Sequence, residues 1–412
     1  MKRIIFFYEH VNRELDSIRR IGEKLEKSKK FNVCIFSIVF EWCDAIRHAR
    51  INGIDAVVFP WIYSDRDFAL AKPFLDVNPK VAIINLHQEQ TGSPFTDPLL
   101  LPHGDCAKNA CHHFVWGDHF AGMLYDAGVQ PGLVHITGSV RMDIGLERTL
   151  YETKKHLSEQ FSLDPNKHWI LYAEDRGWLY QFDKRKLSSL VKRGASESML
   201  AEREKIFRRS LEETVRQING LQKEFFDSFE FIYRPHPGTH AEGIENPYIR
   251  IISDHPISVW LRNIDLLLVW GSTTAFEGEI AGVPVLRHEG FENSVTYRAH
   301  GLDKFPVINN LNEITRGLIE EVALNERDTD IYKNFYGPCD GASVDRTEKA
   351  VKDAILYSCQ MDKPIFCGSF RYRICRKRVF EIVSRIAVRL NLVQCLKRPR
   401  ITYNLYDDLP YV

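Results

Sequence analysis

Residues 266–285, LLLVWGSTTAFEGEIAGVPV, contain in one stretch the unit from which this chain is built. An apolar run, Leu266–Val269, is followed by the polar turn Ser272-Thr273-Thr274, which opens a helix that ends at Gly282. A second apolar run begins at Pro284. Short buried strands separated by helices predict a parallel sheet with helices on both faces.

The same alternation fills most of the 412 residues, and it occurs in two series. The first series of expected strands is Ile4–Tyr8, Phe31–Val39, Asp55–Pro60, Val81–Asn85, Phe114–Trp116 and Leu133–Ile136. The second is Trp169–Ala173, Phe229–Tyr233, Ile249–Ile252, Leu266–Val269 and Pro284–Leu286. A chain of this length exceeds the usual size of one core. We therefore expect an α/β fold of two Rossmann-like domains facing across a cleft, residues 1–155 and 156–360, with residues 312–360 as closing helices of the second.

Bulk composition is that of an ordinary globular protein, with 44% hydrophobic and 27% charged residues. Lys plus Arg and Asp plus Glu both number 55, so the neutral chain gives no reason to expect nucleic acid. Nine cysteines without a CxxC pair indicate reduced thiols and a cytoplasmic location. The cluster Cys106, Cys111, His112 and His113 lacks a second ligand pair, so we expect buried thiols there and no metal. We also expect no signal peptide and no membrane-spanning helix.

Residues 361–412 form a basic tail. Between residues 370 and 400 ten Lys and Arg residues face a single acid, Glu381. Apolar residues recur there at helical spacing, namely Val379, Ile382, Val383, Ile386, Leu390 and Val393. A basic amphipathic helix of this kind is typical of contact with an anionic membrane surface. The alternative is that the apolar stripe packs against the domains while the arginines are solvated.

The loop after Phe231–Tyr233 is the first candidate site. In Arg234-Pro235-His236-Pro237 the prolines fix the backbone, and Arg234 offers a planar fork to a phosphate. His236 can donate a hydrogen bond to a phosphate oxygen. The alternative is a rigid turn with an incidental histidine.

The second candidate is Ser272-Thr273-Thr274, because hydroxyls and free N–H groups at a helix start make an anion site. Taken alone it could be an N-cap with Glu277 completing a capping box. Taken with the Arg234–Pro237 loop, a shared phosphate is the better explanation.

These motifs, RPHP followed by STTxxEGxxxGVPV, resemble the C-terminal half of bacterial surface-polysaccharide glycosyltransferases of the GT-B type with a His-Pro motif. The group includes capsule-type Kdo and sialic acid transferases. The resemblance covers about residues 165–350, including Asp340–Arg346, which is similar to a DGxAxxR stretch of this group. It implies that His236, Ser272, Thr273 and Thr274 contact the phosphate of a nucleotide sugar. It also implies a donor without a metal cofactor.

The catalytic base is left open, because the Asp/Glu-Asp/Glu-Gly motif of polysialyltransferases has no clean counterpart in the N-terminal half. An acceptor hydroxyl must lose its proton to a carboxylate or histidine. Our first choice is the loop after Val81–Asn85, with His87 and Glu89. The second is Glu174 and Asp175 after Trp169–Ala173, where Gly177 and Trp178 could instead hold the donor. The third is Tyr8-Glu9-His10.

The sequence and this resemblance thus predict a glycosyltransferase that moves a sugar onto a surface polysaccharide or lipid-linked glycan. The resemblance implies a lean to a CMP-activated acid sugar as the donor. The enzyme would act in the cytoplasm on the inner face of the membrane, through residues 370–400. Three alternatives stay open: a glycerophosphotransferase of the teichoic-acid kind, a nucleotide-sugar 2-epimerase, and a non-catalytic partner in capsule assembly.

Overall fold

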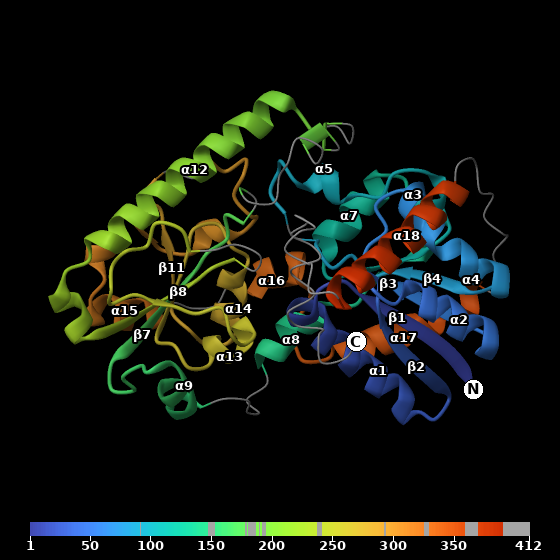
Figure 1. Ribbon diagram of the computed structural model, residues 1–412, viewed down its shortest axis with the longest axis horizontal. Helices are drawn as coiled ribbons and strands as arrows, with labels where there is room; N and C mark the ends of the chain where they lie inside the picture. Colours follow the sequence, from blue (N-terminus) through green and yellow to red (C-terminus); the bar gives the residue numbers. More distant parts are fainter. Residues whose placement is uncertain are drawn as a thin grey trace. The chain divides into compact units, whose positions relative to one another are not determined.

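The computed structural model describes residues 1–90, 92–146, 153–177, 179, 187–188, 190–191, 195–236, 241–291, 294–324, 329–358 and 370–389. The chain divides into two compact units (Figure 1). Unit 1 comprises Met1–Gln90, Leu100–Ile144 and Thr329–Val412, and unit 2 comprises Thr91–Leu99 and Gly145–Asp328. Each unit is built around one parallel sheet, so the expected pair of Rossmann-like domains is confirmed.

Unit 1 contains six strands in the order β2-β1-β3-β4-β5-β6, and every neighbouring pair is parallel. The strands are β1 (Lys2–Tyr8), β2 (Phe31–Ser37), β3 (Ala56–Phe59), β4 (Ala82–Asn85), β5 (His112–Val115) and β6 (Val134–Ile136). Successive side chains of β1 point to opposite faces, as the pleat requires. Ile4 and Phe6 enter one apolar cluster, and Ile5 and Phe7 enter another. Both faces of the sheet are therefore covered.

The helices of unit 1 are mostly short. They are η1 (Val11–Leu15), α1 (Asp16–Lys27), α2 (Trp42–Asn52), α3 (Asp65–Phe68), η2 (Ala69–Ala71), α4 (Lys72–Val77), α6 (Asp105–Asn109), α7 (Asp118–Asp126), η3 (Pro131–Leu133), α16 (Thr329–Phe335), α17 (Ser343–Ser358) and α18 (Phe370–Arg389). Two further helices, α5 (Asp97–Leu100) and α8 (Val140–Leu146), lie where the chain passes between the units.

The position of α17 differs from the sequence expectation, which placed residues 312–360 in the second domain. Ala350, Val351, Ala354 and Ile355 of α17 share an apolar cluster with β1 of unit 1. A helical stripe of apolar residues indicates that one face is buried, but it carries no information on which sheet buries it. The chain therefore returns to unit 1 after residue 328.

Unit 2 contains six strands in the order β12-β11-β10-β7-β8-β9, again with all neighbouring pairs parallel. The strands are β7 (His168–Ala173), β8 (Phe229–Arg234), β9 (Arg250–Ile251), β10 (Leu266–Val269), β11 (Val285–His288) and β12 (Val307–Ile308). Numbered within the unit, this order is 3-2-1-4-5-6, the order of dinucleotide-binding folds. The strand order reverses between β7 and β10.

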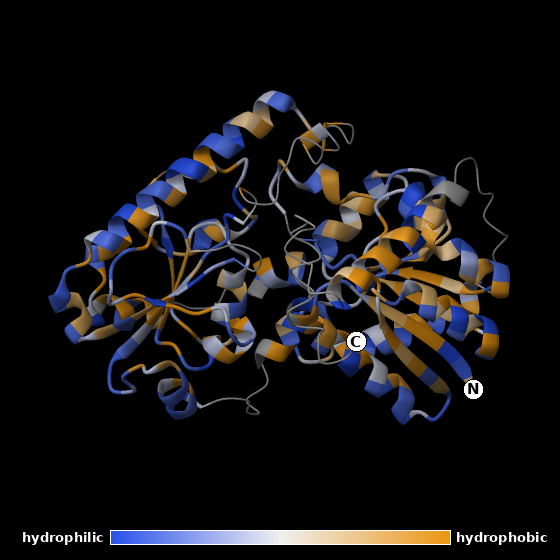
Figure 2. Cartoon of the chain, in the orientation of Figure 1, coloured by the Kyte–Doolittle hydropathy of each residue, from blue (hydrophilic) through white to orange (hydrophobic). Residues whose placement is uncertain are grey.

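The helices of unit 2 include the long α12, which runs along one side of the unit (Figure 1). They are α9 (Lys154–Phe161), α12 (Glu197–Gly220), η4 (Lys223–Asp227), α13 (Ile257–Leu261), α14 (Thr274–Ile280), η5 (Leu302–Lys304), η6 (Leu311–Glu313) and α15 (Arg316–Ala323). Figure 2 shows apolar residues concentrated on the strands of both sheets and mixed colours on the helices. Among the described residues, no helix has both the length and the apolarity needed to cross a bilayer.

Candidate functional site

The carboxyl ends of β7 and β10 are joined by a hydrogen bond in unit 2. The two strands pair in parallel up to Ala173 and Val269. Just beyond that pair, the backbone N–H of Gly271 donates to Asp175 Oδ2 across 2.7 Å. In open parallel sheets, ligands bind outside the carboxyl ends at the point where the strand order reverses. Asp175 and Gly271 lie at that point, so the sheet topology itself marks this edge as a candidate binding site.

Asp175 is chemically distinctive at this position. Burial raises its pKa to about 7, an effect that Glu174 reinforces and the positive charge of Arg176 opposes. Its Oδ1 accepts no hydrogen bond, and its nearest cation is Arg176 Nε at 3.9 Å. The side chain as a whole is 14% exposed, although Oδ1 itself is buried. A carboxyl group with this pKa exchanges protons near neutral pH, as general acid–base groups do.

Glu174, the other acid predicted in this loop, is fully engaged by the protein. Its Oε1 accepts hydrogen bonds from Arg176 N at 2.6 Å and Arg176 Nε at 2.9 Å. Its Oε2 accepts from the Tyr233 hydroxyl at 3.0 Å. The buried Arg176 also donates to three hydroxyls, those of Tyr172, Ser210 and Thr214. This placement does not suit Glu174 as a base, because both of its oxygens hold the strand ends of unit 2 together.

The loop after β8 packs closely on the loop after β7. A Cβ added to Gly177 would lie 2.2 Å from His236 Nδ1, so the imidazole rests directly against the glycine backbone. The guanidinium of Arg234, which we expected to bind a phosphate, is placed differently. It donates to the carbonyls of Asp254 at 2.8 Å and His255 at 2.5 Å, and burial lowers its pKa to about 10. Arg234 therefore fixes the loop, while the imidazole of His236 lies against Gly177.

Two residues predicted for the donor site, Trp178 and Pro237, lie outside the described residues. At the end of β10, Ser272 Oγ accepts from Thr274 N at 3.1 Å. Thr273 precedes α14 but caps it with no side-chain hydrogen bond, so the simple N-cap alternative does not account for its hydroxyl. Glu277 is buried inside α14, with 7% of its surface exposed. The structure thus brings His236, Asp175 and the Ser272–Thr274 turn to neighbouring strand ends, since β8, β7 and β10 are adjacent.

In unit 1 the strand order reverses between β1 and β3, and a hydrogen bond joins the strand ends there as well. Trp61 Nε1, just past β3, donates to Glu9 Oε2, just past β1, at 2.6 Å. Glu9 is 5% exposed. Its backbone N–H donates to Glu14 Oε2 at 2.7 Å. The loop ranked third by the sequence therefore occupies the point that the topology favours.

The first-choice loop, after β4, separates its two candidate bases. His87 is fully buried, and its Nε2 lies 2.8 Å from His113 Nδ1. Burial lowers the pKa of His87 well below its usual value, and the charge of a protonated His113 would lower it further. This position does not suit proton transfer with a substrate. Glu89 is 54% exposed and pairs with Arg13 at 2.7 Å, so it is accessible.

The Cys106–His113 cluster makes interior contacts. His113 Nε2 lies 2.9 Å from the Lys108 carbonyl, and Cys111 Sγ donates to the Ala107 carbonyl at 3.1 Å. The late DGxAxxR stretch is also a structural element. Arg346 forms a two-pronged ion pair with Asp340 and donates to the Thr137 carbonyl at 2.8 Å. It fastens the start of α17 to the end of β6.

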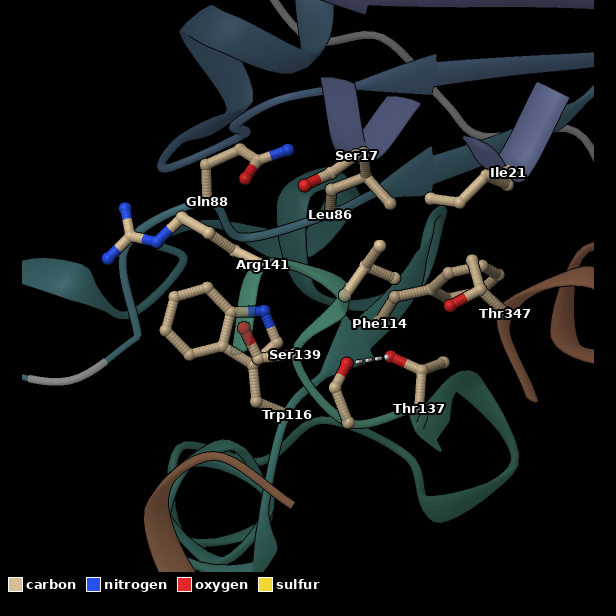
Figure 3. A pocket seen from close by; sticks show the side chains of 12 residues that line it. Ser17, Ile21, Leu86, Gln88, Phe114, Trp116, Thr137, Ser139, Arg141 and Thr347 are labelled. Carbon is tan, nitrogen blue, oxygen red and sulfur yellow. Dashed lines mark hydrogen bonds between the residues drawn. The ribbon is translucent and has the colours of Figure 1, made fainter. Parts of the chain in front are cut away.

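A pocket opens in unit 1 at the carboxyl ends of β4, β5 and β6 (Figure 3). Its polar lining comes from Gln88 after β4, Trp116 after β5, and Thr137, Ser139 and Arg141 after β6. An indole, an amide, hydroxyls and a guanidinium are the groups that proteins use to hold sugars and anions. Residues Gly138, Ser139, Val140 and Arg141 thus line a cavity.

Several solved structures are similar to this chain. No family model and no curated protein matches the chain. Among solved structures, the wall teichoic acid polymerase TagF with CDPG aligns with a TM-score of 0.50 and 11% identity, over 87% of this chain and 90% of that one. The fold is of the GT-B type. The S. aureus MnaA–UDP structure aligns at 0.49 and 14%, over 89% and 100%. The Methanocaldococcus jannaschii UDP-GlcNAc 2-epimerase with UDP-GlcNAc and UDP aligns at 0.48 and 14%, over 85% and 99%.

Sequence reasoning missed three residues that shape the two GT-B strand edges. Arg176 organises the unit 2 edge, and Trp61 and Glu14 organise the unit 1 edge. Trp61 does carry a signal, because a polar-tipped aromatic directly follows the apolar run that ends at Pro60. Arg176 and Glu14 carry none, since a charged residue in a loop or helix is usually solvated and their burial depends on long-range partners.

Proposed function

We propose that this chain is an enzyme that transfers a sugar from a nucleotide-activated donor to a cell-surface polysaccharide or a lipid-linked glycan. The observation that carries the proposal is the edge of unit 2 at which the strand order reverses. There one titratable carboxyl group, Asp175, lies between an imidazole loop and a hydroxyl-rich turn on the two adjacent strands. Nucleotide phosphates bind at such edges through N–H and hydroxyl donors.

The donor phosphate would bind between His236 and the Ser272–Thr274 turn. His236 would donate a hydrogen bond to a phosphate oxygen and thereby stabilise the charge that develops as the sugar leaves. Arg234 would contribute by fixing the loop, since its guanidinium is bound to backbone carbonyls. A CMP-activated acid sugar is the first substrate to test as the sugar donor. Its single phosphate needs few hydrogen-bond donors from the protein, and the proposed site uses no metal.

The acceptor hydroxyl must lose its proton as the new glycosidic bond forms and the nucleotide departs. Glu89 is the accessible acid of our first-choice loop, and Glu9 is the acid at the strand-order reversal of unit 1. We assign the acceptor to unit 1 on this basis. A lipid-linked acceptor would place the reaction at the inner face of the cell membrane.

Titration calorimetry with CMP, CDP, UDP and GDP tests the proposal. We expect one nucleotide to bind the wild-type protein and to bind His236→Ala at least tenfold more weakly. The matched control is His168→Ala, because His168 begins β7 at the opposite end of the strand and is partly exposed. Folded protein that binds none of the four nucleotides would overturn the proposal and favour a scaffold role in glycan assembly.

Product analysis separates transfer from the other enzyme classes. After the nucleotide is identified, its sugar conjugate is incubated with and without a glycan acceptor. Transfer requires the acceptor and releases the nucleotide. Conversion of UDP-GlcNAc without any acceptor would show a 2-epimerase, and transfer from CDP-glycerol would show a glycerophosphotransferase. Either result would overturn the assignment as a glycosyltransferase.

A further inference from the structure

Helix α18 is attached to unit 1 by a face that carries both polar and apolar side chains. It packs against α2 and η2. The most deeply buried of its described side chains are Glu381 at 2%, Ser384 at 0% and Ala387 at 5%. A helix on the surface of a globular protein normally buries its apolar stripe and exposes its polar one. In α18 the buried face is instead mixed, and part of the apolar surface is left outside it.

Hydrogen bonds and ion pairs hold the polar side chains of this packed face in place. Glu381 Oε2 accepts from the Cys43 backbone N–H at 3.0 Å. Arg385 Nε donates to the Phe40 carbonyl at 2.7 Å, and its guanidinium also pairs with Asp44. Lys377 Nζ donates to the Val39 carbonyl at 3.2 Å. The orientation of α18 is therefore set by directional bonds to the segment around α2, together with the packing of Ile374 and Phe380 on an apolar cluster of unit 1.

The apolar stripe consequently faces outward. Val379, Ile382, Val383 and Ile386 are 60%, 56%, 46% and 51% exposed. Their spacing of three, four and seven residues places them on one face of the helix. Water contact with contiguous branched aliphatic side chains is unfavourable in proportion to the apolar area. A contiguous apolar stripe of this kind marks a surface that another apolar phase covers.

Exposed cations border the apolar stripe, and their charge indicates what kind of partner covers it. Arg376, Arg378 and Arg389 are all exposed on α18. A second copy of this chain would bring its own arginines against these and would be repelled. An anionic lipid surface instead offers acyl chains to the stripe and phosphates to the guanidinium groups.

We propose that the outward face of α18 is the surface by which this protein binds an anionic lipid bilayer. The helix, about 30 Å long at 1.5 Å per residue, would lie in the plane of the interface. Ile382 and Ile386 enter the acyl boundary, Arg376 and Arg378 bind lipid phosphates, and the Glu381 and Arg385 bonds keep unit 1 on the aqueous side. This inference does not depend on the chemistry proposed for the enzyme.

The test is co-sedimentation of the full chain with vesicles of phosphatidylcholine alone and with 30% phosphatidylglycerol added (about one lipid in three). We expect binding to the mixed vesicles and little to the neutral ones. The double variant Ile382→Glu and Ile386→Glu should lose at least tenfold in affinity. Because both side chains are exposed, its thermal unfolding should match the wild type. Arg378→Gln should weaken binding about fivefold, in line with one cation near an anionic surface.

The matched control is Leu356→Glu. Leu356 lies on α17 of the same unit and is 67% exposed, but it is not part of the α18 stripe. It should bind like the wild type. Equal binding to neutral and anionic vesicles, or undiminished binding by the Ile382 and Ile386 variant, would overturn the inference. So would a lipid-free dimer that this variant dissociates in light scattering, because the face would then belong to a second copy.

Discussion

The backbone N–H of Gly271 donates to Asp175 Oδ2 at 2.7 Å, and this bond joins the two strand ends between which the order of the unit 2 sheet reverses. It holds a carboxyl group with a pKa raised to about 7 beside the turn that begins at Ser272. The carboxyl group of Asp175 thus has two properties at once: it holds the two strand-end loops together, and it titrates near neutral pH.

Asp175→Asn should remove the pH dependence of nucleotide binding. In the wild type, a rise in pH through 7 ionises Asp175 and brings a negative charge beside the proposed phosphate site, so affinity should fall by up to about tenfold per pH unit above 7. Asparagine keeps an oxygen for the Gly271 N–H but does not ionise. Calorimetry at pH 6, 7 and 8 measures both slopes, and equal slopes would show that another group is responsible.

Gly177→Ala should damage the proposed donor site while the fold persists. The new Cβ would lie 2.2 Å from His236 Nδ1 and 2.5 Å from His236 Cγ, so the ring must move. We expect nucleotide affinity to fall at least tenfold by calorimetry. Gly122→Ala is the control, because a Cβ there meets nothing within 4 Å in α7. That variant should leave binding unchanged and stabilise the helix by about 0.5–1 kcal/mol.

Arg176→Met should destabilise unit 2 strongly. Removal of the guanidinium leaves the Glu174 carboxylate buried without its cation, and breaking a buried pair in this way costs about 3–5 kcal/mol. Urea unfolding followed by circular dichroism measures the loss. Arg208→Ala, which removes an exposed pair with Glu204, should cost no more than about 1 kcal/mol. Similar losses in the two variants would contradict the structural role of Arg176.

Unit 1 should lose stability in mild acid. Burial, together with neighbouring histidines, lowers the pKa of His112 to about 3, and burial lowers that of His113 to about 4. Below pH 6.5 the unfolded chain binds protons that these folded residues do not. The stability they contribute is therefore complete above 6.5 and is lost as the pH falls toward 4 and then 3. At pH 5.5 each of these two histidines lowers the free energy of unfolding by about 1.4 kcal/mol.

The check is the unfolding free energy at pH 7.5 and pH 5.5. His112→Gln cannot take up a proton, so its stability should decline less between the two values. His156→Gln, an exposed histidine in α9, is the control and should decline like the wild type. An unchanged decline in His112→Gln would assign the acid sensitivity to other groups.

Local sequence determined the elements themselves. The run Leu266–Val269 is β10 as predicted, and the expected Trp169–Ala173 differs from β7 by one residue. Buried strands of four to seven residues, separated by turns and amphipathic helices, specify an α/β fold by composition and periodicity alone. The same reasoning placed polar loops at the carboxyl ends of strands, and Asp175, His236 and Ser272 were found there.

Only the tertiary structure decided which of these loops meet. Strand order follows from long-range pairing, so the junctions of Asp175 with Gly271 and of Glu9 with Trp61 have no local signal. Burial likewise turned His87 inward, while helix periodicity in α18 gave the stripe but not its direction. The physical reason is common to these cases. The periodicity of a helix or strand shows that its two faces differ in polarity. What each face packs against depends on residues far away in the sequence, which offer hydrogen bonds, charges or apolar area.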